Sequence, residues 1–219
     1  MSIKVNHYWS VVPKSQEEYQ KFVIKKFIPG INHLGMHTVA VWSVIVGEFS
    51  EIICETACSD LEWVEKALTH KRYRALKTDL LRYVNGYHTK VLLNTGKVSS
   101  YTMDIHEDAV KFNQMWDVRS HKTGEYEYFM THDYIPSLKE IGISVAGEWE
   151  VIIGDGPGII CEGRVSDVAT LIYNLRSRQF QDKKRELKQL VENYRSRILA
   201  FHARKIKSFR STSYQLVNP

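Results

Sequence analysis

Cysteine is scarce in this chain of 219 residues, which holds only Cys54, Cys58 and Cys161. Three thiols are too few, and odd in number, for a disulfide framework. Long hydrophobic runs are missing too, since no apolar segment approaches the roughly 18 residues that a membrane helix needs. The first ten residues, MSIKVNHYWS, contain a lysine but no apolar signal-peptide core. These absences predict a cytoplasmic protein with reduced thiols and no membrane span.

Complete motifs for common cofactors, metals and nucleophiles are also missing. The segment GDGPG at 154–158 joins two predicted strands, whereas a dinucleotide-binding loop joins a strand to a helix. The spacing of Cys54 and Cys58 is not that of a zinc site. His33 and His37 have helical spacing, but the glycine between them and the strand that follows indicate a loop. The sequence therefore predicts no metal site and requires no cofactor, and haem is possible but not indicated.

The positive charge is concentrated near the C-terminus. Residues 176–210 hold twelve Lys or Arg against three Asp or Glu, so they account for more than the whole net charge of +5. One interpretation is a surface for an anionic partner, such as nucleic acid, lipid head groups or an acidic protein. The other is an ordinary solvated helix face, which is the commoner origin of such a cluster.

What the chain does have is a repeat. WSVIVGEFSEIICE at 42–55 and WEVIIGDGPGIICE at 149–162 share eight identical positions at an offset of 107. The same offset aligns Trp9 with Trp116, Tyr19 with Tyr126, Phe22 with Phe129, Pro29 with Pro136, Gly35 with Gly142, Ser59-Asp60 with Ser166-Asp167, Leu68 with Leu175 and Tyr87 with Tyr194. This period is far longer than a solenoid unit, so each copy is expected to be a small domain. The predicted boundaries are 1–95 and 111–203 for the copies, 96–110 for the linker and 204–219 for a basic C-terminal tail.

Each copy predicts the same order of elements. The expected elements are strands at 5–12 and 112–119, helices from 19 and 126 that end near Pro29 and Pro136, hairpins at 37–55 and 145–162, helices at 61–87 and 168–194 broken near their middles, and strands at 89–93 and 197–201. A capping box is expected at 59–62. The order β-α-β-β-α-β is the ferredoxin-like unit, so the fold class is α+β with two tandem repeats. Strand 37–46 is apolar on both faces, which predicts that the two sheets cover each other as an intramolecular barrel.

These elements resemble the dimeric α+β barrel superfamily. The strand segment VAVWSVIVGEFSEIICE, followed by SDLEWVEKALTHKRYRALKTDLL, is similar to the NIPSNAP-like branch. The resemblance implies a pocket between sheet and helices or within the barrel. Members of the superfamily include cofactor-free monooxygenases, haem-binding and haem-degrading enzymes, isomerases, cyclases and ligand-sensing domains, and a shared fold does not choose among them.

Two acids that occur in the second copy alone are the predicted catalytic residues. Glu150 replaces Ser43, and Asp117 replaces Ser10. If they share a buried sheet face, at least one carboxyl has a raised pKa suited to proton transfer. The alternative is a solvent-exposed face, on which the acids pair with Arg119 or a lysine.

Six further residues are candidates for ligand binding: Trp42, Trp149, Glu55, Glu162, His37 and Arg119. In a pocket the tryptophans favour a flat aromatic or apolar ligand, and the repeated glutamates could face the same cavity. The structural alternative is that the tryptophans are core residues and that each glutamate binds a neighbouring cation.

Two functions follow from these patterns. The first is a small-molecule enzyme of the dimeric α+β barrel type, which acts on a hydrophobic or aromatic ligand in a monooxygenase-, isomerase- or cyclase-like reaction. The second is a non-catalytic ligand-binding or interaction protein with a basic C-terminal surface for an anionic partner. A homo-oligomer is compatible with both.

Overall fold

The computed structural model describes residues 3–47, 51–98, 110–207 and 212–216, and the chain divides into two compact units. Unit 1 comprises residues 1–44, 49–93 and 201–219, and unit 2 comprises residues 45–48 and 94–200. Among the described residues, no helix has the length and apolar character needed to cross a membrane.

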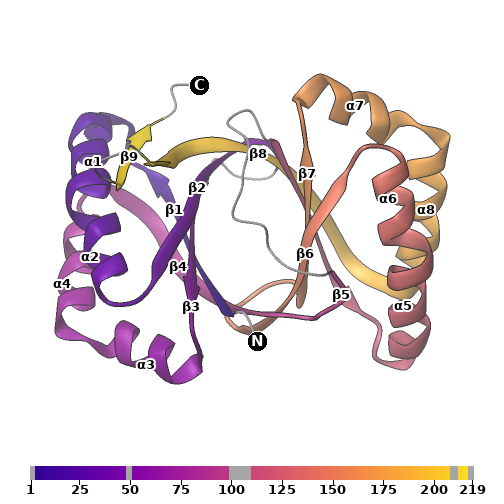
Figure 1. Ribbon diagram of the computed structural model, residues 1–219, viewed down its shortest axis with the longest axis horizontal. Coiled ribbons are helices and arrows are strands. Elements are labelled where there is room, and N and C mark those ends of the chain that lie inside the picture. Colours follow the sequence, from indigo (N-terminus) through magenta and orange to yellow (C-terminus); the bar gives the residue numbers. More distant parts are fainter. Residues whose placement is uncertain (1–2, 48–50, 99–109, 208–211, 217–219) are drawn as a thin grey trace. The chain divides into compact units, whose positions relative to one another are not determined.

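Unit 1 contains an antiparallel sheet whose strand order is β2-β3-β1-β4 (Figure 1). In chain order its elements are β1 (Ile3–Val11), η1 (Pro13–Ser15), α1 (Gln16–Phe22), η2 (Val23–Phe27), α2 (Ile28–His33), β2 (His37–Val46), β3 (Ile52–Cys58), α3 (Leu61–Thr69), α4 (Lys71–Leu80) and β4 (Val84–Asn94). The helices lie against one face of this sheet (Figure 1).

Unit 2 repeats this arrangement with the strand order β6-β7-β5-β8. Its elements are β5 (Val110–Val118), η3 (Ser120–Lys122), α5 (Thr123–Phe129), η4 (Met130–Tyr134), α6 (Ile135–Glu140), β6 (Ser144–Ile153), β7 (Ile159–Val165), α7 (Val168–Arg176), α8 (Arg178–Leu190) and β8 (Val191–Lys207). Both units therefore have the order β-α-β-β-α-β, and the predicted α+β class with two ferredoxin-like units is confirmed. The segment 204–219, expected as a tail, contains the end of β8 and strand β9 (Thr212–Leu216), which pair with each other.

The first helix of each unit continues past the proline at which it was expected to end. In unit 1 the chain passes through the π-helical turn η2, where the Ile28 amide bonds the Val23 carbonyl, and then runs on as α2 with Pro29 in its first turn. A proline has no N–H to donate to the preceding turn, and the wider π turn directly before Pro29 is where the α-helical bonding pattern is already interrupted. Pro136 occupies the same place in α6. The predicted stop at these prolines is therefore wrong.

The predicted break in the second helix is confirmed in both units. His70 is extended, with φ −64° and ψ 137°, and its Nδ1 accepts a hydrogen bond from the Arg72 amide at 3.0 Å, which caps α4. Ser177 has the same role between α7 and α8. The start of α3 differs slightly from the expected capping box, because the cap is Asp60, whose Oδ1 accepts from the Trp63 amide at 2.7 Å.

Gly35 and Gly142 occupy equivalent turns, and their surroundings predict different costs of substitution. Gly35 has φ +84°, and an added Cβ would lie 1.7 Å from Trp63 Nε1; Gly142 has φ +75°, and its nearest neighbour would be 3.6 Å away. We expect Gly142→Ala to cost about 1 kcal/mol for the left-handed backbone. Gly35→Ala should cost a further 1–3 kcal/mol or so, because the indole must move. Urea unfolding of both variants measures the difference, and equal costs would contradict the close approach of Trp63.

Candidate functional site

The helix-covered face of unit 1 contains a histidine that is wholly buried. Side chains alternate between the faces of a strand, so His7 and Trp9 of β1 point to the same side. Both rings lie edge-on to Phe27 of η2, with centroid distances of 6.2 Å and 5.7 Å. This histidine therefore lies between the sheet and the first helix.

Two tyrosines orient His7. Its Nδ1 is 2.9 Å from the hydroxyl of Tyr87, which is in turn 2.7 Å from the hydroxyl of Tyr73. The other ring nitrogen, Nε2, is buried and has no hydrogen-bond partner among the described residues. Burial and, to a smaller extent, the nearby charge of Lys77 lower the pKa of His7 to about 3. The imidazole is therefore neutral near pH 7.

Unit 2 has Gln114 at the position of His7, with a matching hydrogen-bond arrangement. Its Oε1 accepts hydrogen bonds from the hydroxyls of Tyr134 and Tyr194, and its buried Nε2 has no partner within the described part of the chain. Because Oε1 is the acceptor, the N–H groups of Gln114 stay available. By analogy with Gln114 we assign the proton of His7 to Nε2, with Tyr87 donating to Nδ1. With this assignment, each unit holds one buried N–H donor that is positioned by tyrosine and lacks an acceptor among the described residues.

A buried carboxylate in unit 2 was not among the predicted residues. Glu148 on β6 is 1% exposed, and its Oε1 is 2.6 Å from Lys97 Nζ, which is also 3.0 Å from Glu127 Oε2. Burial raises the pKa of Glu148, although the hydrogen bond and charge of Lys97 oppose that shift. Burial acts to lower the pKa of Lys97, but its bonds to Glu148 and Glu127 outweigh this and raise it. The residue at the same place in unit 1 is Val41, so a comparison of the two copies could have revealed Glu148.

The two predicted catalytic acids lack the buried setting that was expected for them. Glu150 is exposed at the end of β6. Asp117 is half-buried, and its carboxylate accepts hydrogen bonds from the Gly158 amide at 2.7 Å and from Asn193 Nδ2 at 2.8 Å. Asp117 therefore fastens the β6–β7 turn to β8. The alternative of a solvent-exposed face describes Glu150 correctly.

The predicted tryptophan and glutamate ligands bind each other. Trp42 Nε1 donates to Glu55 Oε2 at 2.9 Å, and Trp149 Nε1 donates to Glu162 Oε2 at 3.1 Å. A lysine at the same offset completes each group: Lys4 Nζ is 3.8 Å from Glu55, and Lys111 Nζ is 2.8 Å from Glu162. In the β1–β3 register Glu55 lies opposite Asn6, the neighbour of His7, so this group occupies the sheet face that the helices do not cover. These observations fit the structural alternative, in which the tryptophans are core and each glutamate binds a cation.

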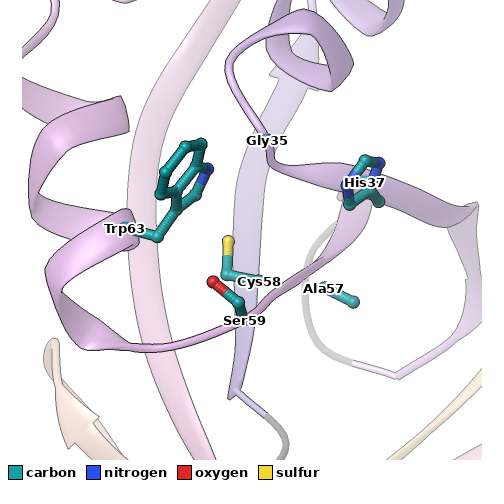
Figure 2. A pocket seen from close by; sticks show the side chains of 6 residues that line it. All are labelled: Gly35, His37, Ala57, Cys58, Ser59 and Trp63. Atoms are coloured by element: carbon teal, nitrogen blue, oxygen red, sulfur yellow. The ribbon is translucent and has the colours of Figure 1, made fainter.

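Of the predicted ligand residues, His37 is among the residues that line a pocket, and Arg119 is in an ion pair. The pocket, in unit 1, has a volume of about 440 Å³ and is lined by Gly35, His37, Ala57, Cys58, Ser59 and Trp63 (Figure 2). Arg119 instead pairs with Glu192 at 3.5 Å in unit 2. Within the described ranges, no three His, Cys, Asp or Glu side chains are grouped so as to hold a metal ion.

The basic residues of α8 are largely paired with acids of the same helix. Lys183 Nζ is 2.9 Å from Glu186, and Arg185 Nη1 is 3.1 Å from Asp182. These pairs favour the solvated-face interpretation for the helix. The side chains from residue 203 onward lie outside the described residues, so an anionic partner for the C-terminal region stays a prediction.

Comparison with protein-family models and with curated proteins finds no match. Solved structures do match. A provisionally named monooxygenase from Fusobacterium nucleatum aligns over 91% of this chain and 92% of its own, with TM-score 0.63 and 9% identity. An anthrone oxidase-like protein aligns over 91% of both chains, with TM-score 0.61 and 8% identity.

These likenesses show the fold, an α+β arrangement shared over most of both chains, and membership of the dimeric α+β barrel superfamily stays a prediction. At such low identity they do not show a reaction. A NIPSNAP family protein from Agrobacterium tumefaciens aligns over only 44% of this chain, with TM-score 0.37 and 18% identity, so the NIPSNAP-like branch stays a prediction.

Proposed function

We propose that this chain is a small-molecule enzyme that acts on a hydrophobic or aromatic ligand in a monooxygenase-, isomerase- or cyclase-like reaction. The observation that supports this proposal best is the unpaired Nε2 of His7, buried and oriented by Tyr87 and Tyr73. A core histidine without a function would be expected to satisfy both ring nitrogens, because an unpaired buried donor costs about 1–3 kcal/mol.

The chemistry that suits this arrangement is stabilisation of negative charge on an oxygen. Reactions of the three types commonly pass through an enolate or phenolate, in which charge moves from the reacting carbon to a conjugated oxygen. A neutral imidazole N–H in a dry site can donate to that oxygen without first losing a proton to it. The low pKa of His7 keeps the ring neutral, and the bond from Tyr87 keeps the proton on Nε2.

Anthrone is a suitable probe substrate, because a structural neighbour is described as anthrone oxidase-like. Its oxidation balances as anthrone plus O₂ giving anthraquinone plus water. Loss of a proton from the central carbon to a solvent base gives the anthrone enolate, whose oxygen would accept from His7. The carbon then gives its electron pair to O₂ and forms a C–O bond, which yields a hydroperoxide once that proton returns. Loss of water, with cleavage of the O–O bond and of the remaining C–H bond, leaves anthraquinone. Product formation can be followed by absorbance.

Two substitutions at His7 test this role. His7→Phe removes the donor but keeps a flat ring, and we expect it to lower kcat by about 10²–10³-fold. His7→Gln, which copies the residue of unit 2, keeps an N–H donor and should lose only a few-fold. Circular dichroism and melting temperature check that both variants are folded. An unchanged rate in His7→Phe, or an equal loss in both variants, would contradict the donor role.

A ligand-binding protein without catalysis is the second candidate, and the pocket in Figure 2 favours it. In the β1–β3 register Cys58 lies opposite Ile3, and Cys54 lies opposite His7. Four residues along a strand span about 13 Å, so a small ligand in the pocket need not touch His7. Saturable binding of anthrone without formation of anthraquinone would favour this candidate over the enzyme.

A further inference from the structure

The pocket of unit 1 lies where three segments meet. Gly35 belongs to the turn between α2 and β2, His37 begins β2, and Cys58 ends β3. Trp63, in the first turn of α3, forms one wall, and Figure 2 shows the Cys58 sulfur and the indole on one side of the strand ends, with His37 and Ala57 on the other. The volume of about 440 Å³ falls within the usual range for small-molecule sites.

Trp63 is held in place and left exposed. Its Nε1 donates to the Leu34 carbonyl at 3.1 Å, which fixes the ring beside Gly35. The side chain is nevertheless 44% exposed, whereas the other four tryptophans of the chain are at most 2% exposed. A large aromatic ring that is rigidly presented to solvent is a common feature of ligand sites, since stacking then needs little ordering of the side chain.

Four of the side chains that line this pocket in unit 1 are not repeated in unit 2. At the offset of 107, the residues that correspond to His37, Ala57, Cys58 and Trp63 are Ser144, Arg164, Val165 and Thr170. The carbonyl of Ile141, which corresponds to Leu34, is bound in unit 2 by Asn174 Nδ2 rather than by an indole. The shared fold therefore does not require Trp63, Cys58 or His37 at these positions.

We propose that this pocket binds a planar aromatic molecule of one or two rings that carries a hydroxyl or carbonyl group. The ring would stack on the Trp63 indole and contact the polarisable Cys58 sulfur, while the Ser59 hydroxyl, which lies on the same side in Figure 2, would bond the polar substituent. Lys66 Nζ lies over one face of the Trp63 ring, 5.9 Å from its centre, and pairs with Glu62 at 2.6 Å, so the ligand would stack on the other face. The inference shares its ligand class with the proposed function, but it does not depend on catalysis by His7.

The test uses 2-naphthol and two readouts that report on this pocket. Trp63 is the exposed tryptophan of the chain, so quenching of the acrylamide-accessible emission follows its occupancy. Cys54 and Cys161 are 0% exposed, so alkylation of the folded protein by N-ethylmaleimide should map to Cys58. Burial raises the pKa of Cys58 to about 11, so the labelling is run near pH 9. We expect saturable quenching, and alkylation of Cys58 that is slowed about fivefold at saturation.

Variants decide whether the pocket is responsible. Trp63→Ala removes the fluorescent reporter, so binding to it is followed by protection of Cys58 from alkylation, and it should be about tenfold weaker because an aromatic stack is lost. His37→Ala is a control within unit 1, because this exposed side chain lies on the other sheet face from Cys58, and it should leave both the fold and the binding unchanged. Thr170→Ala, the matched change in unit 2, should have no effect.

His7→Phe separates this inference from the proposed function. Retained naphthol binding in that variant supports the pocket, whatever the rate of anthrone oxidation. Linear, unsaturable quenching, unprotected Cys58, or binding lost in His7→Phe but kept in Trp63→Ala would each overturn the assignment. The last result would place the ligand at His7 instead.

Discussion

Lowering the pH from 7 to 4 is expected to reduce the free energy of unfolding by about 3 kcal/mol through His7 alone. The folded state holds this imidazole neutral, with a pKa near 3, while the unfolded chain protonates it at the usual 6.5. Between these values the unfolded state binds more protons, so stability falls as the pH falls. The loss begins near pH 6.5 and is complete below pH 3. Urea unfolding at pH 7, 6, 5 and 4 measures it.

Other buried groups modify this slope in known directions. Burial lowers the pKa of His202 to about 4, which adds a smaller loss over the same range because this side chain is only half-buried. Glu148 acts in the opposite direction, since its raised pKa lets the folded state bind a proton more readily than the unfolded chain. Tyr73 and Tyr87, whose pKa values are raised by burial, stay neutral throughout.

His7→Gln is the matched control for the pH series. It keeps the hydrogen-bonding capacity used in unit 2 but has no titrating group, so its stability should fall by about 1.4 kcal/mol less for each pH unit between 6 and 4. If the wild-type and variant curves run parallel, His7 is not protonated on unfolding in this range, and its deep burial as a neutral ring is wrong.

Replacing Lys111 with methionine is expected to destabilise the fold by about 3–5 kcal/mol. The Lys111 and Glu162 side chains are 2% and 0% exposed, and their charged atoms are 2.8 Å apart. Methionine fills similar space but leaves the carboxylate buried without its nearest cation. The melting temperature and the urea midpoint should both fall.

The first control is Lys4→Met in unit 1. Lys4 and Glu55 are equally buried but 3.8 Å apart, so the loss there should be smaller. The second is the double variant Lys111→Met with Glu162→Gln, which should recover part of the loss because no unpaired charge remains. Additive effects in the double variant would show that the two residues do not interact.

The repeat made the order of elements predictable, because each copy supports the other. Alternation along the strands also shows which positions share a face, and the lysine, tryptophan and glutamate of each charged group recur at one offset. What alternation cannot show is which strands are neighbours. Lys4 lies near Glu55 only because β1 pairs with β3, and this long-range pairing cannot be read from the pattern within either strand.

The candidate site was harder to predict, for two physical reasons. A search for histidines that recur at the offset of 107 finds none opposite His7, because the residue there is Gln114. Gln114 nevertheless bonds the equivalent tyrosine hydroxyl with a different atom. A comparison of residue identities therefore misses two residues that make equivalent hydrogen bonds. The second reason is that burial changes along a strand. Glu148 and Glu150 lie on the same face of β6, yet Glu148 is buried and Glu150 is exposed. Alternation predicts the face of a side chain but not how far along the strand other elements cover that face.

The π turns η2 and η4, of five residues each, are places where related chains can lose one residue. Each turn accommodates one residue more than an α-helical turn would, and yet an ordered helix continues on either side. Removal of that residue can be absorbed locally, because the flanking helix closes over the gap without disturbing the strands. Single-residue deletions in distant relatives are therefore expected at residues 23–27 and 130–134, and an alignment that forbids gaps inside helices would misplace everything that follows.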